Sequence, residues 1–148
     1  MNQKRSIAAF DFDGTLTTKD SLLEFLLFAH GRVKTYWGLM LLAPAMMLMA
    51  MGVIDNNRCK EILLRYFFKG MRHEDFERLG SEFAKRGQKI LNPKTCATLK
   101  KHMSEGHEVY IISASVEEWV KPIAETLGEE RALHPTGCGR GRKTDWAL

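Results

Sequence analysis

The chain has 148 residues, of which 45% are hydrophobic and 27% are charged. This length and composition fit one globular domain with a modest core and a small insertion, and they exclude two full domains or a disordered chain. The net charge of +4 is spread along the sequence without a recognition motif. It therefore indicates a weak preference for anionic substrates and no nucleic-acid partner.

The cysteines and the N-terminal residues bear on the compartment. Cys59, Cys96 and Cys138 are odd in number and lack metal-ligand spacing, so they indicate neither a disulfide framework nor a zinc site. Three reduced thiols are typical of a cytoplasmic protein. The apolar run after the basic residues 1–5 is too short for a signal-peptide core and ends at Asp11. We therefore expect a cytoplasmic location.

The first chemically informative segment reads SIAAFDFDGTLT. Residues 7–10 are apolar and uncharged, which predicts a short parallel strand covered on both faces. The alternation of side chains along a strand places Asp11 and Asp13 on one face at its end. Gly14 then permits a sharp turn that brings backbone N–H groups near the carboxylates. Two adjacent acids favour a cation, and oxygen ligands favour Mg²⁺; a plain polar turn is the alternative.

The run DFDGTLT resembles the first signature of the haloacid dehalogenase-like (HAD) phosphatases, in particular the phosphoserine phosphatase-like branch. The resemblance implies that Asp11 is the nucleophile, that Asp13 is the acid/base, and that both contribute to a Mg²⁺ site. It also implies hydrolysis of a small phosphorylated metabolite through an aspartyl-phosphate intermediate.

Apolar residues at helical spacing predict a helix over residues 22–30 and further helices over 55–72 and 73–87. Asp20 occupies the position at which phosphoserine phosphatases carry an acid that contacts the substrate amine, and the cap of the first helix is an equally favoured role. Arg58 and Arg65 are candidates for a bidentate contact with a substrate carboxylate or phosphate. A solvated helix face is the favoured alternative for both arginines.

Residues 35–54 carry no charge and are long enough to span a bilayer. A single crossing would place Asp11 and Ser113 on opposite sides of the membrane, which contradicts a shared site. Pro44 and the neighbouring glycines predict two shorter helices with a break near 43–44. We interpret the stretch as plain core of a helical cap with a Met-rich lining; an apolar substrate tail or a membrane surface is the less favoured contact.

The sequence then returns to a parallel α/β pattern, with a helix over 94–105, a strand over 107–112 and a helix over 116–127. Hydroxyl groups at the end of this strand, ahead of a helix, are suited to binding phosphate oxygens. The run IISAS resembles the second HAD motif, whose first serine binds the phosphoryl group. That resemblance assigns Ser113, with nearby N–H groups at Gly14 and Ala114, to the phosphate, and leaves Ser115 as a cap or second contact.

The resemblance stops near residue 130. The family also requires a lysine beside the nucleophile and a later acidic Gly-Asp motif that completes the Mg²⁺ site, and residues 131–148 match neither. Residues 134–148 are rich in Gly and Arg and show no helix or strand period. Their codons, read one nucleotide later, permit Thr-Arg-Leu and Leu-Thr-Gly, so we hypothesise a frameshift near 131–133. The nucleotide sequence decides this hypothesis.

The predicted fold is α/β: a Rossmann-like parallel sheet core of an incomplete HAD fold, with an inserted all-helical cap. The core comprises residues 1–17 and 92–148, of which 134–148 form a non-native tail, and the cap comprises 18–91. A rival hypothesis is a catalytically silent, truncated HAD-like protein that contacts a membrane surface through 35–54. Phosphoryl transfer to an acceptor other than water would use the same residues, and the oligomeric state is open.

Overall fold

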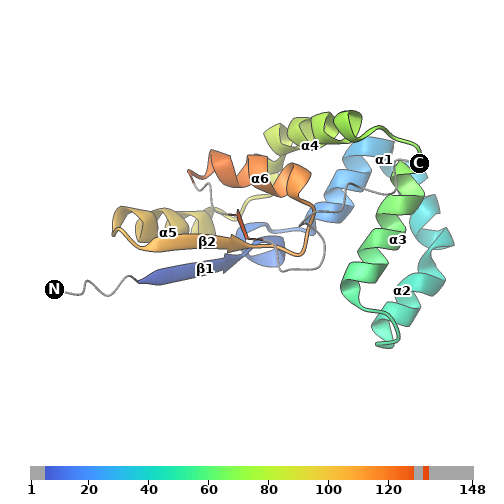
Figure 1. The fold of residues 1–148 in the computed structure, drawn as a ribbon, viewed down its shortest axis with the longest axis horizontal. Coiled ribbons are helices and arrows are strands. Elements are labelled where there is room, and N and C mark those ends of the chain that lie inside the picture. Colours follow the sequence, from blue (N-terminus) through green and yellow to red (C-terminus); the bar gives the residue numbers. More distant parts are fainter. Residues whose placement is uncertain (1–5, 129–131, 134–148) are drawn as a thin grey trace.

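The computed structural model describes residues 6–128 and 132–133, which form a mixed α/β structure (Figure 1). Its sheet has three parallel strands in the order β1 (Ile7–Asp11), β2 (Glu108–Ile112) and β3 (Ala132–Leu133). The register pairs Asp11 with Ile112, the last residues of β1 and β2. The predicted parallel pairing of these two strands is therefore confirmed.

The chain between β1 and β2 is helical. It contains the turn η1 (Phe12–Leu16), α1 (Ser21–Leu41), α2 (Ala43–Ala50), α3 (Asn56–Phe68), α4 (His73–Gly87), η2 (Gln88–Ile90) and α5 (Pro93–Ser104). α6 (Glu117–Thr126) connects β2 with β3. The helices predicted over 55–72, 73–87, 94–105 and 116–127 are thus confirmed to within a few residues.

Both connecting helices, α5 and α6, lie on the same face of the sheet (Figure 1). Val109 and Ile111 point into that face and are buried, whereas Ile7 is 65% exposed and Ile112 is 39% exposed. Parallel crossovers of one hand that advance in one direction place their helices on one side of a sheet. The prediction that residues 7–10 are covered on both faces is therefore wrong for the described part of the chain.

α1 is interrupted at Gly31, whose φ of 74° lies outside the helical region. The sequence predicted a helix end there, and the chain instead resumes the helix after one residue. The predicted break before Pro44 is confirmed, because α1 ends at Leu41 and α2 begins at Ala43, with a bend of 60° between them. Among the described residues no single helix is long and apolar enough to cross a bilayer, although α1 and α2 together meet that test.

The apolar stretch 35–54 is mostly exposed. α2 has no buried residue, and Trp37 and Met47 are 66% and 65% exposed. The interpretation of this stretch as plain core is therefore wrong, because α2 and the adjoining part of α1 extend away from the sheet, and α2 packs mainly on α3 (Figure 1). The exposed apolar face comprises Val33, Tyr36, Trp37, Met40, Leu41, Met46, Met47, Leu48, Met51 and Val53.

A cluster of aromatic rings joins the helical segment to α6. The ring of Phe25 in α1 stacks on Trp119 of α6 at 4.3 Å and on Phe68 of α3 at 5.4 Å. Phe76 and Phe83 of α4 meet the Phe25 ring edge-on. Such pairs add to the free energy gained by burying the rings, so this cluster sets how the helices sit on the α/β part.

The two chain connections at the base of the helical segment also pair with each other. Thr17 and Leu91 form an antiparallel bridge. The N–H of Thr18 donates to the carbonyl of Ile90 at 2.7 Å, and the N–H of Asn92 donates to the carbonyl of Leu16 at 2.8 Å. These bonds hold the beginning and the end of the helical segment side by side.

Gly80 allows α4 to pack closely on α6. A Cβ added there would lie 2.5 Å from the backbone carbonyl oxygen of Glu118, and backbone cannot move away as a flexible side chain can. We therefore expect Gly80→Ala to lower the free energy of unfolding by about 2 kcal/mol. Urea unfolding measures the change, with the exposed Ser81→Ala as control. Equal stability of the two variants would contradict the close contact.

The surroundings of His30 predict that the folded protein loses stability in acid. Its ring packs on Phe67 and Phe68, and its Nε2 is buried without a hydrogen-bond partner among the described residues. Burial, and secondarily the charge of Lys34, lowers the pKa of His30. The folded protein therefore binds this proton less tightly than the unfolded chain, so stability is lost as the pH falls below about 6.5.

Replacing His30 with Phe is expected to keep the ring packing and to remove this loss of stability at low pH. The variant should be about 1 kcal/mol more stable at neutral pH, because the unpaired polar atom is gone, and its stability should depend less on pH between 7.5 and 5. Urea unfolding across this range tests both effects, with His73→Gln, an exposed histidine, as control. An unchanged pH dependence in His30→Phe would exclude this residue as the cause.

Candidate active site

The predicted catalytic segments meet at one edge of the sheet. β1 ends at Asp11 and the neighbouring strand β2 ends at Ile112, and the two residues are in register. Ser113 therefore follows β2 directly beside the end of β1, with no helix between the strands. Ser113 is 1% exposed, whereas Asp11 is exposed to solvent.

The carboxylate of Asp13 is held from two sides. Its Oδ2 accepts a hydrogen bond from the Ser115 hydroxyl at 2.5 Å, and its Oδ1 accepts one from the backbone N–H of Ser21 at 2.9 Å. These donors come from the segment after β2 and from the first turn of α1. Two segments of the chain thus fix the orientation of one carboxylate, and one of them is 102 residues away in sequence.

A buried polar network extends from this carboxylate. The hydroxyls of Ser21 and Ser115 lie 3.2 Å apart, and the indole Nε1 of Trp119 donates to the Ser21 hydroxyl at 3.2 Å. The N–H of Ser115 donates to the Ser113 hydroxyl oxygen at 3.0 Å, a bond that leaves the Ser113 hydroxyl hydrogen unused. The Ser113 hydroxyl can therefore still donate a hydrogen bond to a ligand.

Sequence reasoning missed Ser21 and Trp119. The available signal was the position of Ser21, because the first residues of a helix carry N–H groups without helical partners. Ser115 was expected as a cap or a second contact, and the structure shows it holding Asp13. The assignment of Ser113 to the phosphate stays a prediction.

The turn after β1 is stabilised by Thr17. Its hydroxyl donates toward the carbonyl oxygen of Phe12 at 3.1 Å and that of Lys19 at 2.8 Å, and it accepts the N–H of Gly14 at 3.2 Å. Gly14 has a φ of 79°, as a residue in a sharp turn requires. Since its N–H bonds to Thr17, a phosphate contact at Gly14 stays a prediction.

A lysine that the sequence did not single out reaches this edge. The Nζ of Lys60, on α3, lies 3.4 Å from the carbonyl oxygen of Ala114, between the two serines. Arg58 and Arg65 on the same helix are exposed and both pair with Glu61, at 3.3 Å and 3.7 Å. These distances support the solvated-face interpretation of the two arginines, and their contact with substrate stays a prediction.

Asp20 caps α1. Its Oδ1 accepts the N–H of Leu23 at 2.8 Å, as expected of an N-cap aspartate. The structure thus shows one of the two roles that the sequence allowed, and the contact with a substrate amine stays a prediction.

The donor set at this edge fits Mg²⁺. Asp11 presents an exposed carboxylate, and each oxygen of Asp13 accepts one bond from the chain, which leaves further lone pairs on that carboxylate. Mg²⁺ takes one or two carboxylates and keeps several waters, so two aspartates are the kind of ligand that it uses.

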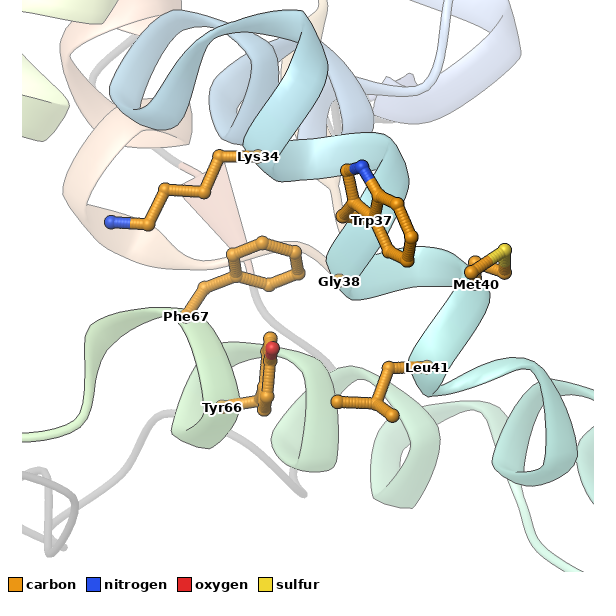
Figure 2. Close-up of a pocket in the computed structure, with 7 residues that line it drawn as sticks. All are labelled: Lys34, Trp37, Gly38, Met40, Leu41, Tyr66 and Phe67. Atoms are coloured by element: carbon orange, nitrogen blue, oxygen red, sulfur yellow. The ribbon is translucent and has the colours of Figure 1, made fainter.

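A pocket in the described part of the chain lies elsewhere. It has a volume of about 430 Å³ and is formed by α1 and α3, with Tyr66 and Phe67 facing the α1 side chains (Figure 2). Its lining comprises Lys34, Trp37, Gly38, Met40, Leu41, Tyr66 and Phe67. None of the predicted catalytic or phosphate-binding residues lines it, so the pocket belongs to the exposed apolar face of α1.

Comparison with solved structures supports this arrangement at the level of the fold. A Bordetella pertussis Tohama I protein of unknown function superposes with a TM-score of 0.72 at 19% identity, over 88% of this chain and 60% of that one. A phospho-aspartyl intermediate analogue of phosphoserine phosphatase superposes with a TM-score of 0.58 at 20% identity, over 89% of this chain and 56% of that one.

Comparison of sequences gives the family. Protein CicA of Caulobacter vibrioides is 33% identical over 133 residues, which are 88% of this chain and 58% of CicA. The chain thus spans little more than half the length of this relative. The profile of the haloacid dehalogenase-like hydrolases matches residues 8–145, which extends beyond residue 130, where the resemblance was expected to stop. Residues 134–148 lie outside the described residues, and the frameshift there stays a prediction. This chain therefore belongs to the haloacid dehalogenase-like hydrolase family.

Proposed function

We propose that the chain acts as a Mg²⁺-dependent phosphomonoester hydrolase of the phosphoserine phosphatase type, through an aspartyl-phosphate intermediate. One observation carries the proposal: the Asp13 carboxylate is held by Ser115 and Ser21 at the sheet edge where Asp11 ends β1. A held carboxylate next to an exposed one suits a reaction that needs a proton carrier beside a nucleophile.

The two carboxylates take different roles in this reaction. An Oδ of Asp11 attacks phosphorus and forms an acyl phosphate, while Asp13 gives a proton to the departing alkoxide. Asp13 then takes a proton from water, whose oxygen attacks phosphorus and releases Asp11 and inorganic phosphate. Ser113, with the N–H of Ala114, binds the phosphoryl oxygens. Mg²⁺ would be held by Asp11 and Asp13, and it would supply positive charge that reduces repulsion between nucleophile and substrate.

The helical segment 18–91 forms a cap over a Rossmann-like core in this proposal. The bridge between its entry and exit segments at Thr17 and Leu91, and the approach of α3 to the segment after β2, support that division. A small phosphorylated metabolite is the proposed substrate, since phosphoserine phosphatase is named for such a compound.

Lys60 is expected to bind the substrate anion from the cap side. Lys60→Met keeps the length of the side chain and removes its charge, so the KM should rise roughly tenfold or more with little change in kcat. Steady-state kinetics on p-nitrophenyl phosphate measure both constants. Lys69→Met, an exposed lysine at the other end of α3, serves as control. An unchanged KM in Lys60→Met would remove this residue from the site.

The direct test of the proposal is p-nitrophenyl phosphate hydrolysis by the purified chain with and without Mg²⁺. We expect turnover that is lost on chelation and restored by Mg²⁺. Absence of turnover at any Mg²⁺ concentration would overturn the assignment for this chain and favour the second candidate function.

The second candidate is a catalytically silent protein that contacts a membrane surface. The exposed apolar face of α1 and α2 favours it, since a large exposed apolar patch marks an interaction site, and Arg32 and Lys34 beside the patch suit anionic lipids. Sedimentation with anionic vesicles is the test. Trp37→Ser with Met47→Ser should abolish binding, whereas Ile7→Ser, an exposed apolar position on the sheet, should not.

A further inference from the structure

The end of α5 brings two histidines together. The N–H of His107 bonds to the carbonyl of His102 at 3.1 Å, and the N–H of Gly106 bonds to the carbonyl of Met103 at 3.0 Å, with a φ of 75° at Gly106. This pair of bonds is the Schellman motif, in which the side chains at the positions of His102 and His107 normally form an apolar contact. Here two imidazoles occupy those positions.

The two rings face each other through their Nδ1 atoms, which lie 2.8 Å apart. A carboxylate oxygen of Glu105 lies 3.7 Å from the His107 Nδ1, and one ligand atom from each of the three residues lies within 4.8 Å of the others. Both histidines are half-buried, and Phe10 packs edge-on against the His102 ring at 5.9 Å. The backbone motif and this ring contact thus hold both imidazoles in place before any ligand binds.

We propose that His102, Glu105 and His107 form a binding site for a divalent transition-metal ion of the zinc type. Two imidazoles and one carboxylate, with water in the fourth position, are a ligand set that Zn²⁺ uses. A tetrahedral ion at about 2.0 Å from each nitrogen requires the nitrogens to be about 3.3 Å apart. Small side-chain rotations from 2.8 Å supply this change. The exposed Glu105 side chain is free of the sheet and can turn toward the ion.

This site is separate from the proposed catalytic edge. His107 immediately precedes β2, and Ser113 immediately follows it, so the extended strand between them places the two sites roughly 20 Å apart. The ligand chemistry differs as well, because imidazole favours zinc-type ions and an all-carboxylate set favours Mg²⁺. An ion bound here would tie the end of α5 to the start of β2, so its expected effect is on stability.

Two measurements on the metal-free full chain test the proposal. Zn²⁺ should raise the melting temperature by about 3 °C or more, since a ligand that binds only the folded state stabilises it. Co²⁺ should give the strong visible absorption of a four-coordinate ion with nitrogen ligands. Both signals should be lost in His102→Gln and in His107→Gln and weakened in Glu105→Gln. His73→Gln, which removes an exposed histidine beside Glu77, is the matched control and should keep them.

The outcomes separate this site from the others in the chain. Asp11→Asn should retain both signals, because that variant alters only the catalytic edge. The proposal is overturned if wild-type protein shows no Zn²⁺-dependent rise in melting temperature, or if the rise survives in the His102→Gln, His107→Gln double variant. Circular dichroism confirms that each variant is folded before the comparison.

Discussion

Replacing Asp11 with Asn is expected to reduce phosphatase turnover by roughly a thousandfold or more. The amide has nearly the same shape as the carboxylate, but its oxygen is neutral and cannot form the acyl phosphate. Asp11 is exposed at the end of β1, so its side chain contributes little to packing. The free energy of unfolding of the variant should therefore lie within about 0.5 kcal/mol of the wild-type value.

The measurement is the release of p-nitrophenolate under saturating Mg²⁺, together with detection of a phosphorylated protein by intact mass spectrometry after rapid acid quench. Wild-type protein should carry one phosphoryl group during turnover, and Asp11→Asn should carry none. Substantial activity in Asp11→Asn, or phosphorylation at another residue, would refute the assignment of the nucleophile.

Asp20→Asn is the matched control for this change. Asn caps helices about as well as Asp, so α1 should keep its cap. If Asp20 serves only as the cap that the structure shows, the variant should retain wild-type kinetics on every substrate. A rise in KM for phosphoserine, with no rise for p-nitrophenyl phosphate, would instead place Asp20 against the substrate amine.

The parts of the fold that the sequence predicted are those decided by neighbouring residues. The limits of α4 followed from its apolar spacing, the break before α2 from Pro44, and the turn after α5 from Gly106. The ends of β1 and β2 could be predicted because the apolar runs stop at Asp11 and Ser113. Each of these features depends on a short stretch of chain, which is why one sequence was sufficient.

The features that the sequence did not reveal depend on distant contacts. Ser115 and Asp13 are 102 residues apart, and Lys60 and Ala114 are 54 apart, so no local pattern links either pair. The exposure of Ile7 likewise depends on which helices cover the sheet, and that is decided by the order of the strands. The composition of residues 35–54 showed that the stretch is apolar, but it did not show the direction in which α1 and α2 extend.

Asp13→Asn is expected to slow the hydrolysis of alkyl phosphates by about 10²–10⁴-fold, the usual contribution of a general acid or base. Asn can keep the bond from the Ser21 N–H through its oxygen, and its NH₂ group can donate to the Ser115 hydroxyl oxygen. The side chain should therefore stay in place, and the loss measures proton transfer and not a change of position.

The identity of the leaving group separates the two proton transfers. p-Nitrophenolate leaves without needing a proton, so Asp13→Asn should still form the aspartyl phosphate from p-nitrophenyl phosphate. Attack by water on that intermediate still requires a base and should be slow. We therefore expect a burst of one p-nitrophenolate per protein, followed by slow turnover, and accumulation of the phosphorylated chain.

Ser115→Ala tests whether the hydrogen bond to Asp13 matters by itself. It removes one of the two hydrogen-bond donors to Asp13 and leaves the carboxylate in place. Turnover should therefore fall roughly tenfold to a hundredfold, without a burst of p-nitrophenolate. An equal loss on alkyl and aryl phosphates in Asp13→Asn, again without a burst, would mean that Asp13 acts only as a ligand or positioning group. Since Asp11→Asn eliminates the intermediate and Asp13→Asn should trap it, the two variants together assign the carboxylates to different steps of one reaction.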